Sequence, residues 1–142
     1  MILTSDRRTE LLGACPLFRG VAAEQLAALA ERATEVEFQP RHVIARQGEI
    51  GTGFFVIVDG RVRVVRDART LATLGPGEFF GELSVLDGQP RIAQVVADEP
   101  TRCLALASWD FETILLEQPA LSLAILRGLA GRLRSVTEQH TQ

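Results

Sequence analysis

Two residues of opposite charge stand close together in an apolar stretch of the chain, 77–97, which reads GEFFGELSVLDGQPRIAQVVA. Glu82 follows Gly81, and Arg91 follows a Gly-Gln-Pro turn nine residues later. The segment after Gly81 is short and fits a single helical turn, whose first N–H groups are free to bind an anion such as phosphate. Arg91 adds a planar set of donors that matches phosphate oxygens.

A carboxylate beside a bound anion is repulsive, so Glu82 needs a second feature in the ligand. A sugar supplies that feature, because its hydroxyl groups donate hydrogen bonds to a carboxylate. A ribose phosphate would satisfy both residues, with a 2′-hydroxyl facing Glu82 and the phosphate facing Arg91. The residues alone leave another interpretation open, in which Glu82 and Arg91 form a structural ion pair across the turn.

The spacing of apolar residues changes twice along the chain, and it indicates the helices and strands that must position Glu82 and Arg91. Leu and Ala at helical spacing predict helices over about 5–33. Short β-rich segments with glycine punctuation predict strands over about 34–107. Helical patterns return over about 108–138, with Pro119 in the first turn of the last helix. The sequence therefore predicts a single α+β domain over 1–142 with a β-roll or barrel at its centre.

Within the strand region, the segment FVIVDGRVRVV reads as two strands joined by a tight turn at Asp59-Gly60. An Asp-Gly pair between alternating apolar residues is a strong hairpin signal. After the turn, valines alternate with arginines, which predicts one buried and one solvated face.

Composition narrows the function. The 142 residues hold 15 basic and 18 acidic side chains, a net charge of −3, which does not indicate a nucleic-acid partner. The cysteines, Cys15 and Cys103, form neither a disulfide framework nor a metal-ligand cluster, so we expect small core residues in a cytoplasmic protein. His42 and His140 are isolated, so no metal site, cofactor or catalytic triad is expected. No secretory signal and no uncharged apolar span of 18 residues is present, so no membrane span is expected.

The chain resembles the cyclic nucleotide-binding domain family, which includes bacterial catabolite activators, regulatory subunits of cyclic-nucleotide-dependent protein kinases and cyclic-nucleotide-gated channels. The phosphate-binding cassette of that family is similar to F-G-E-[LIM]-[AS]-L followed by P-R-x-A-x-V-x-A. The matching residues here are Phe80, Gly81, Glu82, Leu83, Ser84, Leu86, Pro90, Arg91, Ile92, Ala93, Val95 and Ala97. The resemblance covers roughly 15–138 and implies an eight-stranded antiparallel, jelly-roll-like β-roll. It also implies N-terminal helices, a short phosphate-binding helix in a cassette over 79–93, and two C-terminal helices.

The resemblance also implies roles for individual residues. Glu82 would accept from the ribose 2′-hydroxyl, and Arg91 would hold the exocyclic oxygens of the cyclic phosphate. Backbone N–H groups near Leu83 and Ser84 would hold the phosphate too, and the Ser84 hydroxyl either joins them or only caps the turn. The ligand-binding residues expected on this basis are Phe80, Gly81, Glu82, Leu83, Ser84, Arg91, Ile92, Ala93 and Arg132.

Two of these residues bear on the choice of base. Many cGMP-selective relatives carry a Thr after the arginine, whereas Ile92 offers the guanine edge no hydrogen bond, so cAMP is expected to be preferred over cGMP. Arg132 stands where some channels of the family use an arginine from the last helix to cover the base. The alternative for Arg132 is an ordinary place on a solvated helix face.

The sequence thus predicts a bacterial regulatory module that binds a cyclic nucleotide, is not an enzyme, and transmits binding through movement of its terminal helices. An effector domain outside this chain is compatible with that prediction, and no nucleic acid is expected to contact the chain itself. The last helix carries a stripe of leucines that indicates core or a homodimer seam, Leu123, Leu126, Leu129 and Leu133.

Three alternatives compete with that prediction. A member of the same fold that has lost its ligand would act as a structural or protein-interaction domain. An iron–sulfur sensor would need several clustered cysteines, and the two cysteines here are far apart in the sequence. A cupin-like enzyme would need histidine and carboxylate metal ligands, for which a lone histidine in the segment HVIARQGE is too few.

Overall fold

The computed structural model describes residues 2–51 and 53–139, without the side chains of residues 83, 84 and 139. The expectation for His140 therefore lies outside the described residues. Helices α1 (Ser5–Ala14), η1 (Pro16–Phe18, a 3₁₀ turn) and α2 (Ala23–Arg32) open the chain, and α4 (Ser108–Glu117) and α5 (Pro119–Gln139) close it.

The strands lie between these helices and confirm the predicted antiparallel β-roll. They are β1 (Thr34–Phe38), β2 (Val43–Ala45), β3 (Gly53–Asp59), β4 (Val62–Arg66), β5 (Arg69–Leu74), β6 (Phe79–Phe80), β7 (Gln94–Ala97) and β8 (Thr101–Ala107). The short helix α3 (Glu82–Asp87) interrupts the roll between β6 and β7.

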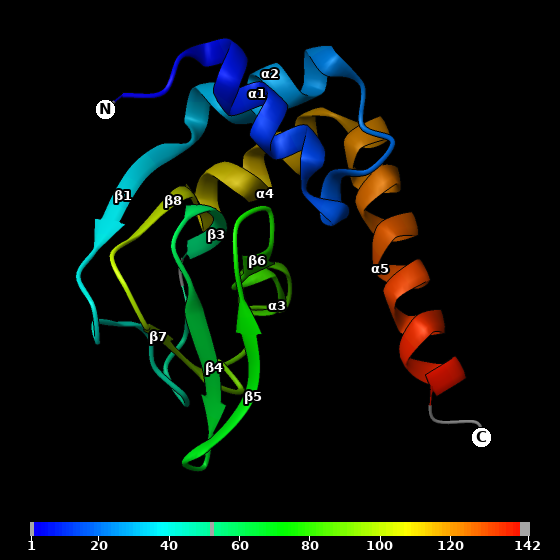
Figure 1. Ribbon diagram of the computed structural model, residues 1–142. Helices are drawn as coiled ribbons and strands as arrows, with labels where there is room; N and C mark the ends of the chain where they lie inside the picture. The colour runs from blue at the N-terminus through cyan, green and yellow to red at the C-terminus, as the bar shows by residue number, and fades with distance from the viewer. Residues whose placement is uncertain (1, 52, 140–142) are drawn as a thin grey trace.

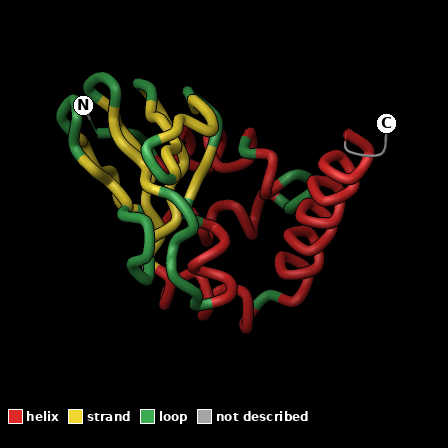
Figure 2. Tube along the Cα trace, turned by 90° about the horizontal axis from the view of Figure 1, so that it is seen from below, coloured by secondary structure: helices red, strands yellow, loops and turns green. Residues whose placement is uncertain are grey.

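Two four-stranded sheets make up the roll, one in the order β1-β8-β3-β6 and the other in the order β2-β7-β4-β5. Every pairing within them is antiparallel. The N-terminal helices and α4 lie over one end of the roll, and α5 runs down beside it (Figure 1). Seen from below, the strands gather on one side and the helices on the other, with α5 at the outer edge (Figure 2).

Strand β3 is apolar along most of its length because both of its faces are buried. Phe54 and Val56 face a helix-side core, whereas Ile57 belongs to a second core between the two sheets. The alternation along a strand sends successive side chains to opposite faces, so a strand between two cores reads as a continuous apolar run. Its partner β8 divides in the same way, with Leu104 in the first core and Cys103 in the second.

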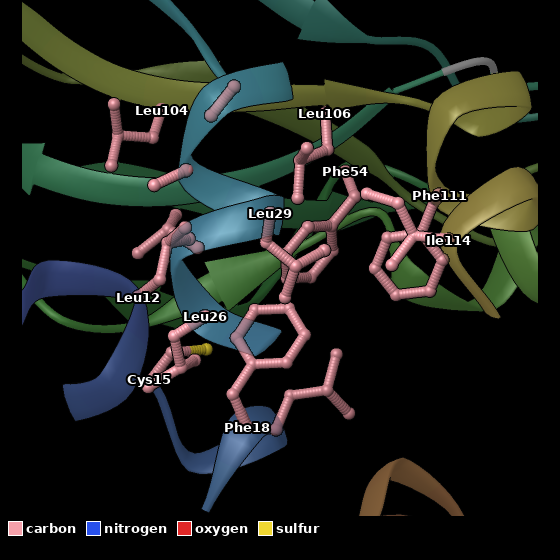
Figure 3. Close-up of a cluster of buried hydrophobic side chains, with 14 of the residues drawn as sticks. Leu12, Cys15, Phe18, Leu26, Leu29, Phe54, Leu104, Leu106, Phe111 and Ile114 are labelled. Atoms are coloured by element: carbon pink, nitrogen blue, oxygen red, sulfur yellow. The ribbon is translucent and has the colours of Figure 1, made fainter. Parts of the chain in front are cut away.

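The helix-side core joins the N-terminal helices to the roll and to the C-terminal helices (Figure 3). Phe18 of η1, Phe54 of β3 and Phe111 of α4 contact one another, with ring centroids 5.6–6.3 Å apart. Cys15 lies in this core as predicted, and Cys103 is equally buried in the other core. Aromatic contacts at these separations add to the hydrophobic stabilisation of the core.

The predicted hairpin at Asp59-Gly60 is wrong. β3 and β4 belong to different sheets, so the turn carries the chain from one sheet to the other. Gly60 has φ +99, and a Cβ there would lie 2.5 Å from the carbonyl oxygen of Pro100, so glycine is required by conformation and by space. The two-residue hairpin lies instead at Asp67-Ala68, which joins β4 to β5 with φ angles of 51 and 65. Neither residue is glycine, which is why the sequence did not mark this turn.

The last helix begins at Pro119 as predicted, and its leucine stripe is largely exposed. Leu123, Leu126 and Leu133 are 46%, 62% and 69% exposed, whereas Leu129 contacts the helix-side core. The core interpretation of the stripe is therefore wrong for three of its four members. Among the described residues no single helix is long and apolar enough to cross a membrane. The pair α4 and α5, bent by 113° at their junction, reaches that length and composition only when taken together.

Candidate functional site

A cleft of about 270 Å³ opens between sheet strands, the start of α3 and the side of α5. Its apolar wall comes from β4 to β7, and its polar groups come from the segment 81–91 and from α5. The lining residues are Val64, Leu71, Leu74, Phe79, Phe80, Gly81, Glu82, Arg91, Ile92, Ala93, Val95 and Arg132. Seven of the nine residues predicted to bind ligand therefore line one cleft.

The entry to α3 is shaped by Gly81. Its φ of +92 is in the left-handed region, and a Cβ there would lie 2.5 Å from the carbonyl oxygen of Gly53. Glycine lets the chain turn from β6 directly into α3 and approach β3 closely. The first hydrogen bond of α3 runs from the Val85 N–H to the Gly81 carbonyl oxygen at 3.4 Å. The backbone N–H groups of residues 82–84 lie before this bond, at the helix start, where N–H groups have no partner within the helix. The side-chain expectations for Leu83 and Ser84 lie outside the described part of the chain.

Glu82 is the first residue of α3, and its side chain is only 12% exposed. One carboxylate oxygen, Oε1, lies 3.7 Å from Nη1 of Arg132. The other, Oε2, is buried and has no hydrogen-bond partner. Burying a carboxylate oxygen without a hydrogen-bond partner costs free energy. A ligand hydroxyl that donates a hydrogen bond to Oε2 would remove that cost.

Arg91 lies on the other side of the same opening. Its Nη2 donates a hydrogen bond to the Gly53 carbonyl oxygen at 2.8 Å. Burial lowers the pKa of Arg91, and the nearby charge of Glu82 partly opposes that shift. The guanidinium remains cationic, so the cleft presents one fixed positive charge next to the start of α3.

Arg132 reaches the cleft from α5, although its side chain is 51% exposed. Its guanidinium carbon lies 4.7 Å from the centroid of the Phe79 ring, a cation–π distance. The solvated-face alternative holds in part, because half of the side chain is exposed while its guanidinium contacts Glu82 and Phe79. The structural-pair alternative for Glu82 and Arg91 also differs from the observed arrangement, since the ion pair of Glu82 is with Arg132.

The remaining predicted residues form the wall. The Phe80 ring stacks on Phe55 at a centroid distance of 4.9 Å, and Ala93 is buried beneath the cleft. Ile92 is 60% exposed at the rim. Sequence reasoning missed the apolar residues of β4 and β5, notably Leu71, which is 58% exposed although it is apolar. No local pattern marked Leu71, because its exposure is a property of the folded chain.

Within residues 2–51 and 53–139, no group of three or more His, Cys, Asp and Glu side chains lies close enough to hold a metal ion. The cleft combines the guanidinium groups of Arg91 and Arg132, a carboxylate with one unpaired oxygen, and a broad apolar wall. Such a combination can bind a small ligand that carries an anion, hydroxyl groups and a flat apolar part.

Residues 35–118 match the model of the cyclic nucleotide-binding domain, and the chain belongs to that family. It is similar to the Cyclic AMP receptor protein of Thermus thermophilus, with 36% identity over 124 residues that cover 84% of this chain and 57% of that protein. It is also similar to the CRP-like cAMP-activated global transcriptional regulator of Mycobacterium tuberculosis. The identity is 31% over 130 residues, covering 88% of this chain and 58% of that protein.

Among solved structures, the chain resembles the N-terminal domain of a transcriptional regulator from Streptomyces coelicolor A3(2). The identity is 33% and the TM-score 0.79, covering 93% of this chain and 95% of that one. The chain spans less than three fifths of the length of the two regulators named above.

Proposed function

We propose that this chain is a regulatory module that binds a cyclic nucleotide and prefers cAMP. The observation that carries the proposal is the buried, unpartnered Oε2 of Glu82 in the same cleft as the guanidinium of Arg91. A ribose 2′-hydroxyl is a donor of the right kind for Glu82, and a cyclic phosphate is an acceptor of the right charge for Arg91. The related regulators that are named for cAMP support the same ligand class.

Base preference follows from the rim of the cleft. Ile92 gives the guanine edge no donor or acceptor, so the site gains nothing from the groups that distinguish guanine from adenine. The apolar wall of Val64, Leu71 and Leu74 suits the face of either purine. We therefore expect cAMP to bind more tightly than cGMP, or the two to be poorly discriminated.

The contact between Glu82 and Arg132 links the cleft to the last helix, α5. The Glu82–Arg132 ion pair joins the first residue of α3 to α5, so a ligand that engages Glu82 acts on a contact of α5. Binding then favours one position of α5 over others, which is a population shift. In this arrangement Arg132 holds the carboxylate that faces the ribose and need not cover the base.

The exposed leucines of α5 support a second part of the proposal. Leu126 and Leu133 are seven residues apart on one face of the helix, which is the repeat of a coiled-coil seam. We propose that this face joins a second copy of the chain, and that an effector domain lies outside this chain. The unpaired thiols Cys15 and Cys103 fit a protein of the cytoplasm.

Calorimetric titration with cAMP and cGMP tests the proposal, together with thermal unfolding. At about 100 times its dissociation constant, cAMP should raise the free energy of unfolding by roughly 2.7 kcal/mol. Absence of any thermal shift with millimolar cAMP or cGMP would favour the alternative, a member of the family that has lost its ligand and serves as an interaction domain.

A further inference from the structure

The segment that precedes β3 holds the backbone of Arg91 by two reciprocal hydrogen bonds. The Gly48 N–H donates to the Arg91 carbonyl oxygen, and the Arg91 N–H donates to the Glu49 carbonyl oxygen, both at 2.8 Å. An isolated antiparallel bridge pairs Ile50 with Pro90 next to them. The backbone of the arginine is therefore fixed by a part of the chain that lies far from the cassette in the sequence.

The same segment and the first residue of β3, Gly53, also contact the arginine side chain. Nη2 donates to the Gly53 carbonyl oxygen at 2.8 Å. A Cβ built on Gly51 would lie 2.1 Å from both Cζ and Nε of Arg91, and the three atoms nearest to it all belong to that guanidinium. On the other side, a Cβ on Gly81 would lie 2.9 Å from Nη1. The guanidinium thus lies between two glycines and against the backbone of Gly51.

Backbone conformation does not explain the glycine at position 51. Gly48 has φ +86 with open space around its absent side chain, so its conformation accounts for it. Gly51 is not among the glycines with positive φ, and it is buried. What a side chain at position 51 would meet is the head of Arg91. Gly51 therefore leaves the space that the guanidinium of Arg91 occupies.

Fixing an arginine in advance matters for binding an anion. A free arginine side chain loses up to about 2 kcal/mol of rotamer entropy when it is ordered, so an arginine that is already held binds its anion more tightly. The bond to the Gly53 carbonyl oxygen uses Nη2, and Nη1 is left beside Gly81, at the start of α3. The guanidinium of Arg91 is thus held in one orientation without any ligand.

We propose that Gly51 is a positioning residue for Arg91: its missing side chain lets the guanidinium lie between Gly51 and Gly81, bonded to the Gly53 carbonyl oxygen and directed at an anion in the cleft. The proposal rests on the proposed function for the identity of the anion, a cyclic nucleotide phosphate. Its structural part, the fit of the guanidinium against Gly51, does not depend on the ligand.

A double-mutant cycle tests it with four proteins: wild type, Gly51→Ala, Arg91→Ala and the double variant. Calorimetry should show that Gly51→Ala lowers cAMP affinity about tenfold or more with Arg91 present, the scale of one charge-assisted hydrogen bond. In the Arg91→Ala background the same substitution should change affinity less than about twofold, since coupled residues are not additive. Gly75→Ala is the control, because nothing lies within 4 Å of its absent side chain and it lies outside the cleft. Equal losses in both backgrounds, or no loss in either, would overturn the proposal.

Two measurements on the unliganded proteins keep the test independent of cAMP. The Nε–H resonance of Arg91, assigned by its loss in Arg91→Ala, should move in Gly51→Ala and stay in place in Gly75→Ala. If Gly51→Ala alone fails to fold, the double variant should fold, because the clash is with the guanidinium. An unmoved resonance, or a double variant as unstable as Gly51→Ala, would refute the positioning role. A wild type that does not bind cAMP would refute the proposed function only, and these two measurements would still decide the role of Gly51.

Discussion

The first prediction concerns the ribose 2′-hydroxyl, which we propose donates a hydrogen bond to Glu82. Oε2 of Glu82 is buried without a partner, so a hydroxyl that reaches it makes a hydrogen bond to a charged acceptor with no competing bond to break. Such bonds contribute about 1.5–3 kcal/mol. Wild type should therefore bind cAMP about 10- to 150-fold more tightly than 2′-deoxy-cAMP, at 1.4 kcal/mol for each factor of ten.

The matching perturbation of the protein is Glu82→Gln. The amide keeps the shape and one acceptor oxygen but loses the charge, and a neutral hydrogen bond contributes only about 0.5–1.5 kcal/mol. The preference for cAMP over the deoxy ligand should fall to about tenfold or less. The unliganded variant should be at least as stable as wild type, because a buried charge with one distant partner stabilises little.

Competition calorimetry with both ligands measures the two preferences, and thermal unfolding measures the stability. Glu112→Gln is the control, since it removes a carboxylate from an exposed position on α4 that lies outside the cleft. Equal affinity of wild type for cAMP and 2′-deoxy-cAMP would show that Glu82 does not face the ribose. A preference that is unchanged in Glu82→Gln would place the ribose against another group.

Three further predictions follow from the same geometry. Ile92→Thr should raise cGMP affinity by about 1 kcal/mol, the net contribution of one neutral hydrogen bond, with little change for cAMP; equal gains for both ligands would mean that the hydroxyl touches the phosphate. Arg132→Ala should weaken cAMP binding by less than about 30-fold, because a half-exposed ion pair and a cation–π contact together contribute about 2 kcal/mol at most, and Arg134→Ala should match wild type. Equal affinities for these two variants would remove Arg132 from the site. Burial raises the pKa of Cys15 from 9.0 to about 11 and that of Cys103 from 9.0 to about 12. The unfolded chain therefore loses these protons first as the pH rises above about 9, and denaturant titrations should show the free energy of unfolding falling in that range. A free energy of unfolding that stays constant up to pH 11 would contradict this.

The sequence by itself predicted an α+β domain with a central β-roll from local patterns, and it predicted the cassette from its resemblance to a known family. A change from helical spacing to alternation and back marks where helices and strands begin and end, since each period places apolar residues on one face. The cassette is a short segment in which Gly81, Glu82 and Arg91 stand close along the chain. A single glycine turn and a short helix are enough to bring them to one opening.

Pairing between strands was not available from local pattern. The Asp59-Gly60 turn has the composition of a hairpin, yet Gly60 is there because its conformation and the nearby Pro100 carbonyl require it. The true hairpin at Asp67-Ala68 has positive φ angles without glycine. Composition therefore identified a tight turn at one site and missed it at the other, because the sheet to which a strand belongs is decided by long-range packing.

The tertiary structure alone decided which residues outside the cassette complete the site. Arg132 is fifty residues from Glu82 in sequence, and only the course of α5 past the roll makes them partners. Gly51 precedes β3 and Gly53 begins it, and the sequence identified that strand only as apolar. Their closeness to Arg91 comes from the bonds that Gly48 and Glu49 make with it. Contacts of this kind depend on which surfaces the fold brings together, and an amino-acid pattern fixes the face of an element but not the partner that the face meets.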